Sequence, residues 1–452
     1  MATRKTTAKN TLGRASRLRV DFGAFFRLEV AGSLVLLAAA IVAITAANSP
    51  WADAYHALWQ VEIGFKVGTW EFSETLLHWI DDGLMALFFF VVGLEIKREV
   101  LVGELSTLRK AALPILAAVG GMLVPALIYL AINAGGEGAN GWGVPMATDI
   151  AFALGVLALL GSRVPPALKI FLTALAIADD IGAILVIAAF YTAEIHASWL
   201  LAGLAFMLVL VAFNWAGIDH PLPYFLVASV IWFAFLHSGI HATIAGVLVA
   251  FAIPAKARIA PTVFTEWARA KLEEIEACDV PGAHVLEDPT QQECAFEIRE
   301  VAIHTTAPLQ RLEHELHPVS TFVILPLFAL ANAGVTLTGY ELSELIFEPV
   351  TVGVFLGLLV GKSVGILAFS WLAVRLGFAD LPRGVRWRQV LGAGILGGIG
   401  FTMSLFVSNL AFRGQLLLAE AKLSILVTSL VAGGIGYAYL RWVSGKEAAP
   451  GQ

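Results

Sequence analysis

Long, uninterrupted apolar runs are the feature that most limits what this chain can fold into. A run of roughly 20 apolar residues matches the thickness of the hydrocarbon core of a bilayer. In lipid the backbone must satisfy its own hydrogen bonds, and a helix does so within one segment. A membrane β-barrel would show alternating segments of about 10 residues instead, and only 14% of the 452 residues are charged. The sequence therefore predicts an all-α polytopic membrane protein.

Hydropathy predicts about twelve spans within a single membrane domain at residues 28–441. Their approximate bounds are 28–47, 82–96, 112–133, 142–161, 168–190, 198–215, 223–236, 239–254, 319–335, 351–374, 389–411 and 420–440. With twelve spans, the clusters of Lys and Arg all fall on one side, together with both ends of the chain. Because basic loops stay inside, we expect a basic cytoplasmic N-terminus at 1–27 and a cytoplasmic tail at 442–452.

Two segments between the spans have patterns of their own. Apolar residues alternate with others over 59–73, which predicts an extracytoplasmic β-hairpin. Such a hairpin serves either as a dimer contact through sheet pairing or as a lid over a helix end. Residues 255–318 form a long acidic cytoplasmic loop, in which Thr265–Ala277 has the pattern of a short amphipathic helix. A charge-rich loop of this kind is usually a solvated surface.

Two of the predicted spans are interrupted by Gly and Pro. They read GWGVPMATDIAFALG at 141–155 and LGAGILGGIGFTMSLFVS at 391–408. Close helix packing alone would explain one such span. However, the two are the middle spans of corresponding groups of three in the two halves of the chain. Paired interruptions of this kind are typical of inverted repeats and mark the binding site of a transporter.

Adjacent aspartates, Asp179 and Asp180, lie inside an otherwise apolar span. A charged group there costs at least about 2.5–3.5 kcal/mol on insertion scales, which makes it a candidate functional group. Two such carboxylates cannot both ionise cheaply, so they titrate as a coupled pair. Their oxygens also suit an alkali cation, so one site can hold protons or a cation. The alternative interpretation is that the two aspartates have hydrogen-bond partners and serve only helix packing.

Two further charges lie within spans. Asp149 is in the first interrupted span, where a carboxylate could neutralise the partial charge of an exposed helix end. Lys362 could do the same for the opposite polarity or pair with a carboxylate. The alternative interpretation is that the Lys362 side chain extends to the membrane–water interface, although the residue lies near the middle of its span.

Seven stretches of the chain resemble the NhaA family of sodium/proton antiporters. They include HWIDDGLMALFFFVVGLEIKRE, LKIFLTALAIADDIGA and LGGIGFTMSL, and the seven cover residues 78–99, 143–163, 168–183, 237–246, 311–335, 357–366 and 396–405. The resemblance extends through most of the predicted spans. It implies twelve transmembrane helices with inverted repeats, two of them discontinuous and crossing, with a homodimer formed through the hairpin.

The resemblance also implies a role for each matching residue. Asp179 and Asp180 would bind the cation, Na⁺, and the protons. The residues that would compensate charge and form the helix breaks are Asp149, Thr148, Lys362, Gly398 and Gly400. Of these, Lys362 could also pair with Asp179. Asp82 would line an ion funnel, and the pH response would involve Glu95, Glu99, His241, Glu313, His314 and His317.

The implied function is Na⁺(Li⁺)/H⁺ antiport by alternating access, electrogenic and pH-regulated, in the inner membrane of a bacterium. We expect a secondary transporter rather than an enzyme, with no cofactor and no nucleic acid; its partners would be lipid, Na⁺, Li⁺, H⁺ and a second copy. Three features depart from the family pattern: Asp81 replaces the common Asn, Ser363 replaces the common Pro, and the loop at 255–310 is longer and more acidic. These departures bear on the pH profile more than on the ion chemistry.

Three other classes share some of these features. An intramembrane aspartyl protease also uses two membrane carboxylates, but on different helices, and this chain lacks a GxGD motif. A passive cation channel would show no obligatory proton counterflow. A sodium-coupled symporter is compatible with the same carboxylates, but the sequence suggests no pocket for an organic solute.

Overall fold

The computed structural model describes residues 22–68, 70–192, 194–277, 289–336 and 346–445. It divides into two compact units. Unit 1 comprises Met1–Val61, Arg109–Ala183 and Thr321–Gln452, and unit 2 comprises Glu62–Leu108 and Ile184–Ser320. Most of the predicted N-terminal segment and the end of the predicted tail lie outside the described residues.

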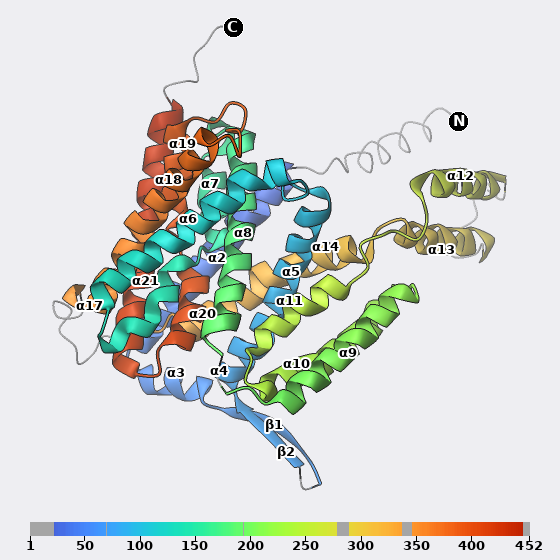
Figure 1. The fold of residues 1–452 in the computed structure, drawn as a ribbon. Helices are drawn as coiled ribbons and strands as arrows, with labels where there is room; N and C mark the ends of the chain where they lie inside the picture. Colours follow the sequence, from blue (N-terminus) through green and yellow to red (C-terminus); the bar gives the residue numbers. More distant parts are fainter. Residues whose placement is uncertain (1–21, 69, 193, 278–288, 337–345, 446–452) are drawn as a thin grey trace. The chain divides into compact units, whose positions relative to one another are not determined.

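Helices are the regular secondary structure of the described parts of unit 1, joined by loops such as the one at 376–386 (Figure 1). Its elements are α2 (Phe22–Ala47), α3 (Ala52–Trp59), α6 (Leu108–Asn133), η2 (Glu137–Met146), α7 (Ile150–Leu159), η3 (Gly161–Arg163), α8 (Pro166–Phe190), α15 (Leu325–Asn332), α17 (Pro349–Leu356), η6 (Gly357–Gly361), α18 (Lys362–Arg375), α19 (Trp387–Gly397), α20 (Phe401–Ala411) and α21 (Gln415–Gly445). Within the unit, α2 packs on α7, and α19 packs on both α18 and α21. The chain leaves unit 1 inside α8, just after the two adjacent aspartates.

Unit 2 contains the single sheet found among the described residues. Its elements are β1 (Glu62–Val67), β2 (Trp70–Thr75), α4 (Leu76–His78), η1 (Trp79–Leu84), α5 (Met85–Val102), α9 (Ala197–Trp215), α10 (Pro221–Ser238), α11 (Ala242–Ala252), α12 (Pro261–Ala277), α13 (Pro289–His304) and α14 (Pro308–Val319). Its core lies among α5, α9, α10 and α11, where Leu94, Ile231 and Phe235 are buried together.

The predicted hairpin is present and antiparallel, with Glu62 opposite Thr75 and Val67 opposite Trp70. Its bounds differ from the prediction at the start. Trp59, expected to begin the first strand, instead ends α3, where it is buried. The alternation of apolar residues therefore extends past the strand into the preceding helix, which the sequence pattern alone could not separate.

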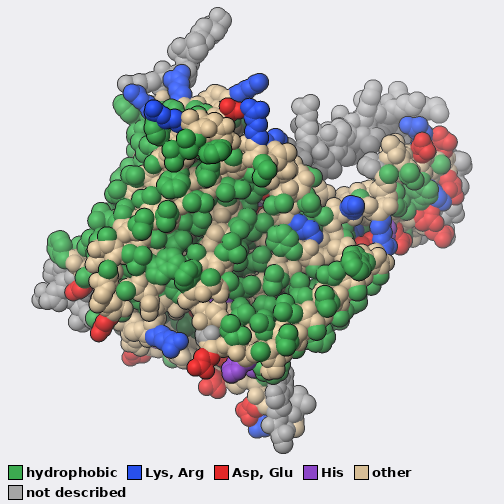
Figure 2. Space-filling view, viewed as in Figure 1, with side chains coloured by type: hydrophobic (Ala, Val, Ile, Leu, Met, Phe, Trp, Pro, Cys, Tyr) green, Lys and Arg blue, Asp and Glu red, His purple; other side chains and the backbone are tan. Residues whose placement is uncertain are grey.

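Eight helices of the described chain are long and apolar enough to cross a membrane, or ten when each of two bent helix pairs counts as one span. Two of the twelve predicted spans are not among these helices. The span 82–96 falls on α5, whose last turns are charged, and the span 239–254 falls on α11, which has only 11 residues. Hydrophobic side chains cover much of the visible face (Figure 2). On α6 they form a stripe at helical spacing, exposing Ile115, Val119, Leu123 and Leu127, as a lipid-facing helix requires.

The predicted acidic loop is largely helical where it is described. The expected amphipathic helix is present as α12, and Lys271 on α12 pairs with Glu297 on α13 at 2.8 Å. The helix α14 begins at Pro308, well before the predicted start of the next span at 319. It continues through η5 (Ser320–Ile324), a π-helical turn, into α15. The predicted boundary was late because the charged residues of α14 lower its hydropathy.

Candidate functional site

The helix α8 places Asp179 and Asp180 in the interior of unit 1. Each residue is only 2% exposed. One oxygen of Asp179, Oδ2, lies 2.7 Å from Nζ of Lys362, whose side chain is also buried. The other oxygen, Oδ1, accepts no hydrogen bond from any described residue. A buried charge is tolerated only when it is paired, so the lysine compensates one carboxylate of the two.

Close helix packing brings Lys362 to this position. The π-helical turn η6 directly precedes the lysine, which begins α18; such turns are frequent at functional sites. Gly120 on α6 and Gly365 on α18 face each other so closely that a Cβ on either would collide with the carbonyl oxygen of the other. A Cβ on Gly121 would lie 3.7 Å from Cδ of Lys362. Glycine therefore lets the two backbones approach and positions the ammonium group.

The two predicted interruptions are present as bent helix pairs. The axes of η2 and α7 differ by 45°, and those of α19 and α20 by 47°. The two breaks meet inside unit 1: the hydroxyl of Thr148 donates to the carbonyl oxygen of Gly397 at 2.9 Å, and the Asp149 N–H donates to that of Ile399 at 2.7 Å. Backbone groups released by one break are therefore satisfied by the other, as membrane burial demands.

Asp149 joins the starts of two helices. Its Oδ1 accepts a hydrogen bond from the Phe152 N–H at 2.9 Å, which caps α7. Its Oδ2 accepts from the Thr402 N–H at 3.1 Å and from the Thr402 hydroxyl, in the first turn of α20. A carboxylate is stabilising where two helix N-termini converge, because both carry partial positive charge.

Gly398 and Gly400 lie at the second break, as predicted. A Cβ on Gly398 would come 2.5 Å from the carbonyl oxygen of Leu358 in η6, so the break packs tightly against the turn before Lys362. Hydroxyl groups support this region. The hydroxyl of Ser404 donates to the Val144 carbonyl oxygen, and that of Ser429 accepts from the Phe401 N–H.

Three of these supporting residues were not predicted from the sequence. They are Thr402, Ser404 and Ser429, all buried. Small hydroxyl residues are common in membrane helices, so only the unusual run GIGFTMS around the break could have singled out Thr402. The same run contains Ser404, whereas Ser429 lies outside it and had no signal of its own.

The remaining predicted residues, those of the ion funnel and the pH response, belong to unit 2, where they lie at more than one place. Asp82 is in η1, where its Oδ2 lies 3.0 Å from Nε2 of His78. The indole N–H of Trp232 donates to the Asp82 carbonyl oxygen at 2.9 Å. A ring nitrogen of His241 lies 3.0 Å from the carbonyl oxygen of Tyr191.

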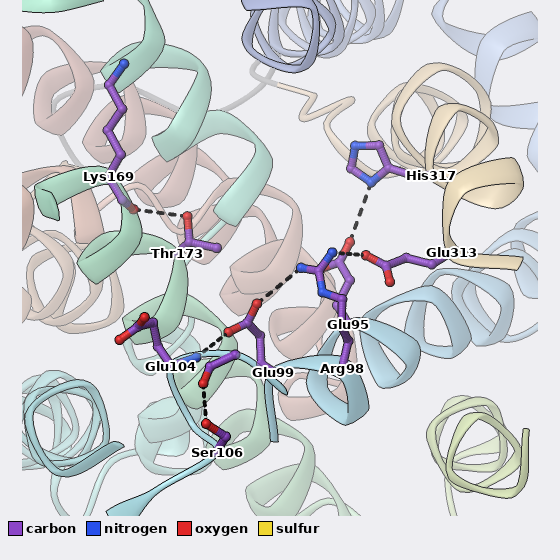
Figure 3. A network of polar contacts seen from close by, with 10 residues as sticks. Glu95, Arg98, Glu99, Glu104, Ser106, Lys169, Thr173, Glu313 and His317 are labelled. Carbon is purple, nitrogen blue, oxygen red and sulfur yellow. Dashed lines mark hydrogen bonds and ion pairs between the residues drawn. The ribbon is translucent and has the colours of Figure 1, made fainter. Parts of the chain in front are cut away.

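A network of partly exposed charges joins the end of α5 to α14 (Figure 3). Arg98 lies between Glu313 at 2.5 Å and Glu99 at 3.2 Å. Nδ1 of His317 lies 3.5 Å from Oε1 of Glu95. Four of the predicted pH-response residues therefore lie in one cluster, with Arg98 as its cation. His314 is exposed and takes no part in these contacts.

Comparison with known proteins identifies what the chain is similar to. A family model described as Na⁺/H⁺ antiporter 1 matches residues 23–440. A relative from Oleidesulfovibrio alaskensis, named Na(+)/H(+) antiporter NhaA, is 51% identical over 94% of this chain and 94% of its own length. One of the same name from Acidithiobacillus ferrooxidans is 51% identical over 94% of this chain and 98% of its own. A third, from Rhodospirillum rubrum, is 48% identical over 92% and 96%.

Proposed function

This chain belongs to the Na⁺/H⁺ antiporter 1 family, and we propose that it is a secondary transporter that exchanges Na⁺ for protons across a bacterial membrane. The substrates, sodium and protons, follow from the names of relatives that match nearly the whole chain. The apolar helices supply a multi-pass membrane body. The transported ions are substrates, and the proposal requires no cofactor.

The observation that carries the proposal is the buried group of Asp179, Asp180 and Lys362. Two adjacent carboxylates with one ammonium have an excess negative charge, which either protons or a hard cation can neutralise. Oxygen ligands suit such a cation. Binding Na⁺ therefore favours loss of protons, and binding protons favours loss of Na⁺. Competition at one site, opened to one side of the membrane at a time, is sufficient for exchange.

The bent helix pairs support alternating access in this proposal. At both breaks the backbone is held by side chains and by the opposite break rather than by a continuous helical ladder. Rearranging these connections would break a few single hydrogen bonds, whereas unwinding an intact helix would break a continuous series of them. Asp149 would keep the converging helix starts neutral throughout, while Lys362 balances Asp179 when sodium is absent.

Further features of the transport cycle belong to the same proposal. Two protons would exchange for one Na⁺ or Li⁺, which makes transport electrogenic, and the proton gradient would drive sodium out of the cell. The network around Arg98 would respond to cytoplasmic pH, with His241 as a second modulator. The hairpin β1–β2 would join two copies into a homodimer, with both termini of each copy in the cytoplasm.

A transport assay in everted membrane vesicles tests the proposal. Wild-type protein should show Na⁺-dependent proton movement, and Asp180→Asn should abolish it, because the neutral amide can neither release a proton nor balance sodium. The matched control is Asp53→Asn, which alters an exposed aspartate of α3 and should transport normally. Retained sodium-dependent proton movement in Asp180→Asn would overturn the assignment.

A further inference from the structure

The ion pair of His78 and Asp82 stands apart from the charges already described. Nε2 of His78 lies 3.0 Å from Oδ2 of Asp82, with side-chain exposures of 42% and 15%. The two residues flank the start of the π-helical turn η1, between the hairpin and α5. The Thr75 hydroxyl accepts a hydrogen bond from the His78 N–H and fixes the start of α4. Solvent can therefore reach the histidine, and the carboxylate lies behind it.

The surroundings of this pair are acidic. Oε2 of Glu74, at the end of β2, lies 4.0 Å from Nδ1 of His78. The charge of Asp81 also acts on His78, and that of Asp82 acts on His241 at the start of α11. The hydrogen bond that Asp82 accepts from His78 raises the pKa of the histidine, and the nearby carboxylates add to this effect, whereas partial burial opposes it.

We propose that His78 is a proton-operated switch on Asp82, through which protons compete with Na⁺ for access to this carboxylate. The inference rests on the proposed antiport. Protonated, His78 pairs with Asp82 and adds positive charge, so the acidic group attracts sodium weakly. When His78 is neutral, the negative charges of Glu74 and Asp82 are no longer offset by it, and they concentrate the cation.

The direction of the pH effect follows from the raised pKa. A histidine whose pKa is raised by its partner contributes a favourable interaction at low pH, and this interaction is lost as the pH rises through the raised value. The switch is therefore closed to sodium in acid and opens toward alkaline pH. A purely structural hydrogen bond between the same two residues would have no such dependence.

The test measures the KM for Na⁺ in vesicles, with the pH set on the side to which the hairpin is exposed. Three variants are compared with wild type: His78→Gln, which keeps a hydrogen-bond donor without the charge; His78→Lys, which keeps the charge at every pH; and His56→Gln as the control. His56 is exposed, and its ring nitrogen lies 3.0 Å from the Thr336 hydroxyl rather than near a carboxylate.

Two like charges about 4 Å apart in water repel enough to change affinity about fivefold. The ratio of KM in wild type to KM in His78→Gln should therefore be about 5 near pH 6. It should approach one at the alkaline end of the series, once the pH has passed the raised pKa of His78 and both side chains are neutral. His78→Lys should keep a high KM even there, and His56→Gln should follow wild type throughout.

A ratio that stays constant across this pH range would overturn the inference and leave a structural role. Failure of the wild type to move protons with sodium would instead overturn the proposed function, so the two failures are distinct. If His78→Gln does not accumulate, the imidazole of His78 is titrated by NMR in wild type and in Asp82→Asn. The midpoint should fall in Asp82→Asn, and an unchanged midpoint contradicts the switch.

Discussion

Two charged clusters of similar composition lie in different surroundings. In unit 1, the side chains of Lys362 and Asp179 are 1% and 3% exposed and their charged atoms lie 2.7 Å apart. In unit 2, those of Arg98 and Glu313 are 37% and 13% exposed, at 2.5 Å. The separations are alike, so burial rather than geometry distinguishes the two pairs.

Burial decides what each cluster can do. A buried pair loses its hydration, so removing one partner leaves a charge with nothing to compensate it. In the proposed antiport, such a site would bind one ion only by releasing another. A partly exposed pair is screened by water and contributes little to stability. It can gain or lose protons at small cost, which suits a response to cytoplasmic pH.

The largest effect is expected from Lys362→Met. It removes the cation from the buried pair and should lower the free energy of unfolding by about 3–5 kcal/mol, with loss of transport. Thermal unfolding in detergent measures the change in stability, and a vesicle assay measures transport. The double variant Asp179→Asn, Lys362→Met should recover much of the stability but no transport. An unchanged melting temperature in the single variant would show that the pair is not buried as described.

Thr402→Val should have the next largest effect. It removes the hydroxyl that donates to Asp149 while retaining the shape of the side chain and the N–H donor. A hydrogen bond to a charged group is worth about 1.5–3 kcal/mol, so unfolding should become easier by about that amount and transport slower. Thr402→Ser retains the hydroxyl and serves as the control. Equal behaviour of the two variants would exclude this role for the hydroxyl.

Arg98→Gln should have a smaller effect on stability. Because Arg98 is more than a third exposed, solvent screening limits its contribution to about 1 kcal/mol or less. The expected change is instead in the pH at which transport reaches half its maximum, with the maximal rate preserved. A pH series of transport rates measures both the midpoint and the maximal rate. An unchanged midpoint would show that the network takes no part in the pH response.

Deleting residues 262–303 should have the smallest effect. The N–H of Arg258 donates to the carbonyl oxygen of His304 at 3.1 Å, so the two ends of this helical insertion already meet. A short glycine linker can therefore replace it without straining unit 2. We expect transport within about twofold of wild type, since the remaining packing is intact. A moved pH midpoint would show that the acidic insertion takes part in regulation rather than acting as a spacer.

Much of the membrane body could be predicted because its causes are local. Apolar runs define helices, and Gly and Pro marked both interrupted spans, at Pro145 and around Gly398. The hairpin followed from alternation, although its first strand begins at Glu62 rather than Trp59. The start of α14 was missed because charged residues there lower the local hydropathy while the helix continues.

Local patterns predicted the site only as a set of residues, and the pairing of Lys362 with Asp179 was expected from the family resemblance alone. Asp179, Asp149 and Lys362 were conspicuous because charge is expensive in an apolar span. Which residues meet depends on folding between distant segments: Lys362 is 183 positions from Asp179, and Thr402 is 253 from Asp149. No local pattern encodes such a pairing. The contact between His78 and Asp82 is local, yet the π-helical turn beside it had no signal in the sequence.

The central claim is that protons and sodium share the carboxylates of Asp179 and Asp180. It is tested most directly by measuring the protons released when Na⁺ is added to the purified protein in weakly buffered detergent solution. Wild type should release protons over a range of pH, and Asp180→Asn should release none. Equal release by both proteins would place the exchange elsewhere and contradict the claim.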